Sequence, residues 1–442
     1  MTVLVVGSGG REHAVARKLR LNPSVGMIYA LPGNAGMALD PACAPVERVG
    51  IPATDLDSIV EFARTRLVDF AVVTPDDPLC LGLVDTLESA GVAAFGPTKA
   101  AARIEGSKSF AKELMRRAGI PTAGYRVFDE VEDALAFVRQ SPMPVWIKAD
   151  GLALGKGVVG ARTVGEAEEA ARAAMLDGKF GSAGLRVVIE EDLRGVEASL
   201  LLFTDGERYR IMPAAMDHKR AFDGDRGPNT GGMGAIAPHP LVTPDLLSRI
   251  EREIIIPTLA AMREEGCPFK GCLFIGLMLT GDGPKVIEYN CRFGDPEAQA
   301  ALALLESDLL DIMLSVRNGT LDSADVRFSG GAACCVVAAS GGYPGAYRKG
   351  LPIQPKDIFL LTTQRRDVTI DYAGVSRPAD GSAGLVTSGG RVLGVTAAAP
   401  TLAEASRRAY GALGEISFEG MRFRADIGAK ALQLAGEEVM DG

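Results

Sequence analysis

The chain opens with T-V-L-V-V-G-S-G-G-R-E-H-A, residues 2–14, in which an apolar run leads into a glycine-rich turn and then a helical pattern. This order predicts a buried strand followed directly by a helix. Met27–Ala30, Phe70–Val73 and Val92–Phe95 repeat the short apolar pattern, with helical segments between them. Alternating short strands and helices predict a doubly wound parallel sheet over about the first hundred residues, with ligands at the carboxyl ends of its strands.

The rest of the chain follows other patterns. Val145–Ala149 reads as a buried strand, and residues 198–216 and 272–290 read as antiparallel strands joined by Gly- and Asp-containing turns. Ala332–Ala339 and Leu402–Leu413 read as a strand and a helix of a separate closing unit. The expected fold is therefore a multidomain chain of the α/β and α+β classes.

Composition restricts the possible partners. The 442 residues are 47% apolar, and 47 Lys and Arg face 56 Asp and Glu, for a net charge of -9. This balance argues against binding to nucleic acid or to an anionic membrane surface. The apolar runs are too short for a membrane span, the start reads as a strand and not as a signal peptide, and the seven cysteines include no C-x-x-C pair. We expect a cytoplasmic protein with reduced thiols, whose chemistry relies on Lys, Arg and carboxylates.

The turn after the first strand resembles a dinucleotide fingerprint but departs from it at the sixth position, where Glu12 replaces the glycine that packs the helix. This departure argues against a nicotinamide dehydrogenase. Free N–H groups at the helix start would still hold a phosphate, and Arg11 would add a charged contact. A tight turn that merely needs small residues is the alternative.

The segment G-L-A-L-G-K-G, Gly151–Gly157, resembles a phosphate loop without matching a Walker A motif, because its spacing is shorter and Gly157 stands where Ser or Thr should hold magnesium. A glycine loop carrying Lys156, attached to a strand carrying Lys148, can close over a triphosphate. The alternative is a flexible hairpin with solvated lysines.

Carboxylates gather at the end of the strand in V-V-I-E-E-D-L-R-G-V-E, Val187–Glu197. Glu190 and Glu191 end the strand, and Glu197 follows a glycine bend. Carboxylates there can accept hydrogen bonds from an adenine amino group or from ribose hydroxyls, while apolar neighbours enclose the base. The alternative is an ordinary solvated strand end.

The segment K-V-I-E-Y-N-C-R-F-G-D-P-E, Lys285–Glu297, alternates with period two, which sends Glu288 and Asn290 to one face of a strand. Two neighbouring oxygen ligands suit magnesium, which completes its shell with phosphates and water. Arg292 continues on the same side, where it would grip a substrate carboxylate. A structural ion-pair network is the alternative.

A long polar, glycine-rich stretch occupies Asp217–Gly234. Its length and missing periodicity predict a functional loop, and disorder is the alternative.

The chain resembles the phosphoribosylamine–glycine ligase family of the ATP-grasp superfamily in five motifs, which follow the family's order and span nearly the whole chain. They are G-G-R-E-H-A from Gly9, K-A-D-G-L-A-L-G-K-G-V from Lys148, D-H-K-R from Asp217, G-P-N-T-G-G-M-G from Gly227 and N-C-R-F-G-D-P-E from Asn290. The resemblance implies an N-terminal doubly wound domain, an ATP-grasp core with a mobile lid at about residues 122–190, and a C-terminal closing domain. The corresponding boundaries are 1–102, 103–328 and 329–442.

The resemblance also implies ligands and site residues. ATP would be held by Lys108, Lys148, Gly155, Lys156, Gly157, Glu190, Glu191, Leu193 and Glu197. Magnesium or manganese would be held by Glu288 and Asn290. The phosphoribosyl and amine side would involve Gly9, Gly10, Arg11, Glu12, His13, Asn34, Thr74, Pro75, Asp76, Gly231, Gly294 and Asp295. The implied catalytic residues are Asp217, Lys219 and Arg292.

The implied reaction is ATP-dependent ligation of glycine to phosphoribosylamine through an acyl phosphate, by a monomer or weak dimer whose partners are small molecules. Three segments depart from the family pattern: T-P-D-D-P-L at Thr74–Leu79 replaces G-P-E-x-P-L, Ile236 replaces an aromatic residue, and L-L-T-T-Q at Leu360–Gln364 replaces F-H-A-G-T. They leave open a related ligase that uses another amino acid or amine. The retained D-H-K-R and R-F-G-D-P-E motifs disfavour a non-catalytic nucleotide sensor.

Overall fold

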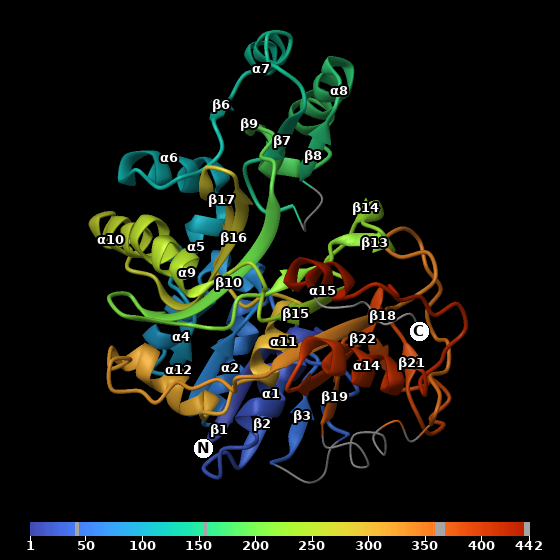
Figure 1. Ribbon diagram of the computed structural model, residues 1–442. Helices are drawn as coiled ribbons and strands as arrows, with labels where there is room; N and C mark the ends of the chain where they lie inside the picture. Colours follow the sequence, from blue (N-terminus) through green and yellow to red (C-terminus); the bar gives the residue numbers. More distant parts are fainter. Residues whose placement is uncertain (40–43, 154–156, 357, 359–366, 437–442) are drawn as a thin grey trace.

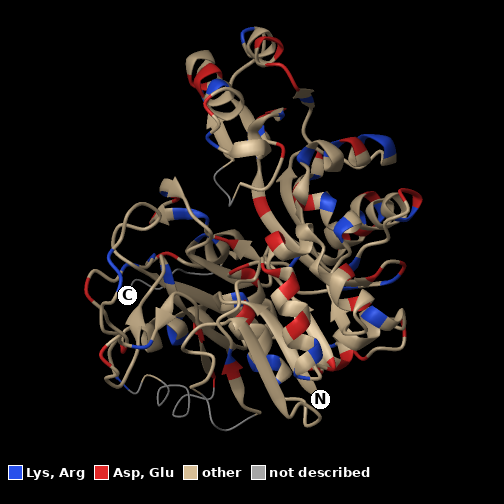
Figure 2. Ribbon diagram, turned by 180° about the vertical axis from the view of Figure 1, so that it is seen from behind, with Lys and Arg blue, Asp and Glu red and all other residues tan. Residues whose placement is uncertain are grey.

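The computed structural model describes residues 1–39, 44–153, 157–356, 358 and 367–436. A broad base of three sheets carries a small lobe that projects from it, with α7 and α8 on the outside of the lobe (Figure 1). Acidic and basic residues are interspersed along the helices of both parts (Figure 2). In the described part of the chain, no helix is long and apolar enough to cross a membrane.

The N-terminal sheet is parallel, with strand order β3-β2-β1-β4-β5, and confirms the predicted doubly wound arrangement. Its strands are β1 (Thr2–Gly7), β2 (Met27–Pro32), β3 (Val46–Arg48), β4 (Phe70–Val73) and β5 (Ala93–Phe95). Its helices are α1 (Gly10–Leu19), α2 (Leu56–Thr65), α3 (Asp76–Leu81), α4 (Leu83–Ser89) and α5 (Lys99–Gly106). The strand order reverses between β1 and β4, so the turns after these two strands meet at the switch point where such sheets bind ligands.

The projecting lobe, called the lid below, is a sheet of order β6-β9-β7-β8 covered by two helices. Its elements are β6 (Tyr125–Phe128), α7 (Val131–Val138), β7 (Val145–Ala149), β8 (Val158–Ala161), α8 (Val164–Met175), η1 (Gly181–Gly184) and β9 (Val187–Glu191). The lid has a hydrophobic core of its own, in which Leu135, Ile147 and Ala171 are buried together. Helix α6 (Lys108–Ala118) leads into it. An independent core lets a small lobe keep its shape apart from the base.

The central sheet is antiparallel, with order β11-β10-β16-β17. Its strands are β10 (Val196–Asp205), β11 (Tyr209–Ile211), β16 (Lys270–Thr280) and β17 (Gly283–Asn290). The flanking helices are α9 (Pro244–Ile250), η2 (Glu251–Ile255), α10 (Ile256–Glu264), α11 (Glu297–Ala303) and α12 (Leu309–Asn318). Leu200 and Ile275 of this sheet share one hydrophobic cluster with Leu4 and Val73 of the N-terminal sheet, so the two sheets form one continuous base.

The third sheet, of order β12-β15-β18-β22-β19, combines two distant parts of the chain. Its strands are β12 (Met216–Asp217), β15 (Gly234–Ala237), β18 (Ala332–Ala339), β22 (Arg391–Ala399) and β19 (Val368–Tyr372). Close by are β13 (Arg220–Phe222), β14 (Arg226–Asn229), β20 (Val375–Ser376), β21 (Val386–Thr387), α14 (Leu402–Leu413) and α15 (Ala429–Ala435). The boundary expected at residue 329 remains a prediction, but the sheet itself crosses it.

Candidate active site

A buried cluster of two lysines and one carboxylate joins the lid to the base. Strand β7 carries Lys148 and strand β9 carries Glu190, and their ammonium and carboxylate groups meet at 3.0 Å (Nζ to Oε2). Lys112 of α6 reaches the same oxygen at 2.9 Å. All three side chains are buried, and Glu190 Oε1 has no hydrogen-bond partner among the residues that the structure describes. The cluster therefore carries one more cation than anion.

Lys112 was absent from the sequence-based predictions, although Lys148 and Glu190 were in them. It lies four residues after Lys108, which places both lysines on one face of α6. That spacing was the available signal, but lysines at helical spacing are usually solvated, so the signal alone does not single out the residue.

Lys108 lies where α6 meets the end of β7. Its ammonium donates to the carbonyl oxygen of Gly151 at 3.1 Å, and its backbone N–H donates to Asp150 O at 3.0 Å. Burial lowers the pKa of Lys108, and the charge of Glu288 partly opposes this. Gly157 follows the loop, and its carbonyl accepts from the Ala149 N–H at 2.8 Å. The predicted nucleotide contacts Gly155 and Lys156 lie outside the described residues.

The remaining predicted nucleotide residues are on or next to β9 and β10. Glu191 Oε1 accepts from the Gly124 N–H at 2.8 Å, which ties the end of β9 to the segment before β6. Leu193 is half-buried in the turn between β9 and β10. Glu197 pairs with Lys219 at 2.7 Å and is about half exposed, so the structure links this predicted ribose contact with a predicted catalytic lysine.

Glu288 and Asn290 lie two residues apart at the end of β17, opposite Gly276 and Phe274 of β16, and therefore share one face. Burial alone raises the pKa of Glu288, but the positive charges of Lys219, Lys148, Lys108 and Arg292 outweigh it and hold the pKa below its usual value. Asn290 Oδ1 accepts from Arg292 Nη2 at 3.1 Å. An ionised carboxylate next to an amide oxygen is a donor set that suits a hard divalent cation.

Arg292 is held by Glu105 of α5, with 3.3 Å between Nη2 and Oε1. The other oxygen of Glu105 accepts from the Cys291 N–H at 2.7 Å. Burial opposes the charge of Arg292, yet Glu105 and Asp76 together raise its pKa. The guanidinium therefore stays positive beside Asn290, as an anion-binding role requires.

A small cavity lies between β10, β12 and β17. It is lined by Glu197, Ser199, Asp217, Lys219, Glu288 and neighbouring apolar residues. Asp217 Oδ1 is buried, and in the described part of the chain it has no partner. Burial and the nearby charge of Glu297 raise the pKa of Asp217 well above its usual value. Residues predicted to bind the nucleotide, to bind the metal and to act in catalysis therefore line one cavity.

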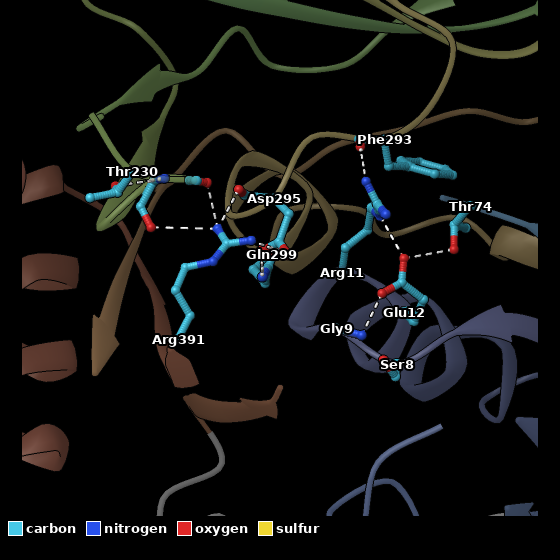
Figure 3. A network of polar contacts seen from close by, with 12 residues as sticks. Ser8, Gly9, Arg11, Glu12, Thr74, Thr230, Phe293, Asp295, Gln299 and Arg391 are labelled. Carbon is cyan, nitrogen blue, oxygen red and sulfur yellow. Dashed lines mark hydrogen bonds and ion pairs between the residues drawn. The ribbon is translucent and has the colours of Figure 1, made fainter. Parts of the chain in front are cut away.

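Glu12 holds the glycine turn after β1 together (Figure 3). Its carboxylate accepts from the Gly9 N–H at 2.6 Å, Arg11 Nε at 2.6 Å and Thr74 Oγ1 at 2.8 Å. Arg11 also donates to the Phe293 carbonyl at 3.0 Å. The Gly9 N–H is therefore engaged within the protein, and its predicted phosphate contact requires an exchange of partners, whereas Arg11 has further N–H donors.

His13 and Asn34 join the N-terminal sheet to β19. His13 Nδ1 accepts from the Tyr372 N–H at 2.7 Å, and its ring stacks on that of Tyr372. Burial, with the charges of Arg17 and Arg20, lowers the pKa of His13 to about 3. Asn34 donates to Tyr372 O at 2.8 Å. Both predicted substrate residues thus make interdomain contacts here.

Arg391 at the start of β22 fixes a second part of this region (Figure 3). It pairs with Asp295 Oδ2 at 2.8 Å and donates to the backbone carbonyls of Asp295 at 2.7 Å and Gly231 at 2.5 Å. Gln299 donates to the other Asp295 oxygen at 2.8 Å. Sequence reasoning missed Arg391, because a lone arginine after two glycines carries no periodic signal.

The other predicted substrate residues lie around these two networks. Pro75 precedes α3, and Asp76 is its first residue. Gly10 begins α1, where a Cβ would lie 2.8 Å from Gln299 Nε2. A Cβ at Gly294 would lie 2.5 Å from Glu297 Oε2, so the close approach requires glycine there.

The stretch Asp217–Gly234 is more ordered than the predicted loop. It contains the hairpin of β13 and β14, and Arg424 pairs with Asp225 in the hairpin turn at 2.8 Å. The predicted loop thus includes two short strands, which the sequence did not indicate because short polar strands show no hydrophobic alternation.

Three family models match the chain, each described as a part of phosphoribosylglycinamide synthetase: the N domain over residues 1–105, the ATP-grasp (A) domain over 106–298 and the C domain over 333–430. A relative from Vibrio parahaemolyticus named phosphoribosylamine--glycine ligase is 47% identical over 99% of this chain and 100% of its own length. A relative of the same name from Escherichia coli is 46% identical over 98% of this chain and 99% of its own length.

Solved structures show the same architecture. The crystal structure of phosphoribosylamine--glycine ligase from Thermotoga maritima has a TM-score of 0.81 and 33% identity, and covers 97% of this chain and 100% of that chain. A biotin carboxylase from Campylobacter jejuni, solved as a complex with β-γ-ATP, has a TM-score of 0.72 at 15% identity over 96% of this chain and 92% of that chain, and supports the fold alone.

Proposed function

The chain belongs to the phosphoribosylglycinamide synthetase family, and we propose that it joins glycine to 5-phosphoribosylamine at the expense of ATP. The products would be glycinamide ribonucleotide, ADP and phosphate. The observation that carries the proposal is the small cavity, in which Glu197 and Glu288 of the nucleotide and metal set line the same space as Asp217 and Lys219.

ATP would lie between the lid and the central sheet, with its phosphates facing Lys108 and Lys148. The surplus positive charge in the cluster around Glu190 supports this placement, because a buried cation without a full partner favours an arriving anion. Leu193, Glu190 and Glu191 would meet the base, and Glu197 the ribose.

Glu288 and Asn290 would hold a divalent cation, which would neutralise charge on the transferring phosphoryl group. Among the described residues, no group of three or more His, Cys, Asp and Glu is placed to hold a metal on its own. A two-oxygen site fits magnesium or manganese only when phosphate oxygens complete the shell. The low pKa of Glu288 supports this role, since it keeps the carboxylate ionised.

The glycine carboxylate would be oriented by Arg292 and attack the γ-phosphorus, forming a C–O–P linkage as ADP departs. The amine of phosphoribosylamine would then attack the carbonyl carbon, forming the C–N bond as phosphate leaves. Asp217 lines the same small cavity and would take up the proton that the amine loses. Closure of the lid would exclude water, which otherwise hydrolyses the acyl phosphate.

The decisive experiment is mass-spectrometric identification of the product formed from ATP, magnesium, glycine and freshly made phosphoribosylamine. We expect a product with the mass of glycinamide ribonucleotide. ADP should form when glycine and phosphoribosylamine are both present, and at a lower rate with glycine alone. Parallel reactions with alanine and serine test the related-ligase alternative. ADP formation that ignores glycine would overturn the proposal.

Arg292→Ala tests the assignment of the amino-acid side. We expect the KM for glycine to rise by about a hundredfold or more, because a buried charged contact is lost, while the Kd for ATP stays within about twofold. An unchanged glycine dependence would contradict the role of Arg292.

A further inference from the structure

The two oxygens of the Glu190 carboxylate differ in their hydrogen-bond partners. Its Oε2 receives both ammonium groups, at 2.9 Å from Lys112 and 3.0 Å from Lys148. Its Oε1 is buried and has no partner among the described residues. A buried carboxylate oxygen without a donor is costly, so this atom is matched to a ligand that brings an N–H or O–H group.

Lys112 is anchored independently of Glu190. Its ammonium donates to Thr122 Oγ1 at 2.7 Å, and that hydroxyl donates to Val286 O of β17 at 2.6 Å. The ring of Tyr125 lies 5.7 Å from the same ammonium. Lys112 is therefore fixed to the central sheet through Thr122, and it holds Glu190 of the lid.

Lys148 is held differently. Its ammonium lies 3.4 Å from the carbonyl oxygen of Ile287, and its charge acts on both Glu288 and Lys108. These groups form the phosphate and metal region of the proposed function. A bound triphosphate would compete with Glu190 for Lys148, whereas Lys112 is tied to Thr122 at 2.7 Å. In the nucleotide complex, Lys112 is then the main partner of Glu190.

We infer that Lys112 is a positioning residue for base selection: it holds Oε2 of Glu190 so that Oε1 accepts a hydrogen bond from the 6-amino group of adenine. This inference rests on the proposed function, which places ATP at this cluster. A base with an oxygen at position 6 presents an acceptor to the same carboxylate and is disfavoured. Lys112 would thus determine specificity without touching the nucleotide.

The test is equilibrium binding of ATP and of ITP, whose base has a 6-oxo group, without glycine or amine. Omitting both acceptors makes the result independent of the ligase reaction, so failure of this inference is distinct from failure of the proposed function. The variants are Lys112→Met, which keeps most of the length of the side chain and removes the ammonium group, and Lys112→Arg, which keeps its charge. Lys99→Met, at an exposed position on α5, is the matched control.

We expect Lys112→Met to reduce the ratio of Kd for ITP to Kd for ATP by about tenfold, through weaker ATP binding, because the discriminating hydrogen bond is then poorly aligned. Lys112→Arg should recover part of the ratio, and Lys99→Met should not change it. Equal weakening of ATP and ITP by Lys112→Met would show that Lys112 contributes only charge, and would overturn the inference.

Thr122→Val gives a second test that keeps Lys112 and removes its anchor. We expect a smaller decrease of the same ratio, by about threefold, since the ammonium loses one hydrogen bond. This variant also serves if Lys112→Met does not fold. An unchanged ratio in folded Thr122→Val, together with an unchanged ratio in any folded Lys112→Met, would refute the positioning role.

Discussion

Buried charges are arranged differently in two proposed parts of the site. We call the residues around Lys148 and Glu190 the nucleotide side, and the networks of Arg11 and Arg391 the acceptor side. On the nucleotide side, Lys108, Lys112 and Lys148 face Glu190 and Glu288, and one carboxylate oxygen has no partner in the described structure. Around Glu190, two ammonium groups share one carboxylate oxygen. We propose that this arrangement favours an anion.

On the acceptor side, two arginines are already paired with carboxylates. Arg11 is paired with Glu12, and Arg391 is paired with Asp295 and with the carbonyl oxygen of Gly231 (Figure 3). The contrast leads us to propose that ATP would bind with little change at the nucleotide side, whereas a ligand at the acceptor side would approach arginines that already have protein partners.

Lys148→Met should have the largest effect on activity. It removes one of the two ammonium groups that contact Glu190. We expect kcat/KM for ATP to fall by about a hundredfold to a thousandfold, since a group aimed at the transferring phosphoryl charge is lost. The measurement is initial-rate ADP formation. Lys349→Met, at an exposed position far along the chain, controls for loss of a lysine, and an equal loss in both variants would contradict the assignment.

Arg391→Lys tests the acceptor side. Lysine keeps the charge but cannot reproduce the forked contacts with Asp295 and Gly231, so we expect KM for the amine substrate to rise by about tenfold. The Kd for ATP, measured by calorimetry, should not change. Arg348→Lys, whose partner Glu419 is also exposed, is the control. A matching increase in the ATP Kd would show that the two sides are not energetically separate.

Thr74→Val tests how much the hydrogen bonds around Glu12 contribute to the stability of the protein. The substitution keeps the shape and removes the hydroxyl that lies 2.8 Å from Glu12 and 3.0 Å from the Val6 carbonyl. We expect the free energy of unfolding in urea to fall by about 1–3 kcal/mol, because a buried charged acceptor loses a donor. Thr320→Val, at an exposed position, should have little effect, and equal losses in the two variants would argue against the role of Thr74.

His13→Asn gives the smallest expected effect, on the pH dependence of stability. The folded pKa of His13 is about 3 and the unfolded value is near 6.5, so between these values the unfolded chain binds the extra proton and stability falls as pH falls. Asparagine can accept from the Tyr372 N–H without titrating. We expect the slope between pH 6.5 and 5 to flatten by up to about 1.4 kcal/mol per pH unit, and an unchanged slope would contradict this contribution.

Local sequence patterns located the elements that are fixed by nearby residues. Phe70–Val73, Val145–Ala149 and Ala332–Ala339 are strands with the predicted limits, because each is a mainly apolar run bounded by polar, glycine or proline residues. Leu402–Leu413 is a helix with the predicted limits, capped by Thr401. The period of two at the end of β17 also placed Glu288 and Asn290 on one face.

Contacts between distant segments were beyond such patterns. Arg391 and Asp295 are 96 positions apart, and nothing near either residue indicates the other. Lys112 shows the same limit, since the role proposed for this helix residue depends on Glu190, which lies on a strand of the lid. Family motifs named the residues of the site, but the chemistry of Lys112 and Arg391 appears only once the chain is folded.

The third sheet also limits how this protein can be truncated, because it combines β12 and β15 with β18, β22 and β19. A fragment that stops before β18 keeps β15, whose four residues are all buried, but loses the strand that pairs with it. An open apolar edge of that kind invites aggregation. The C-terminal part therefore has to be supplied during folding, either in the same chain or by co-expression, and any shortened chain made for isolated study of the nucleotide site should retain it.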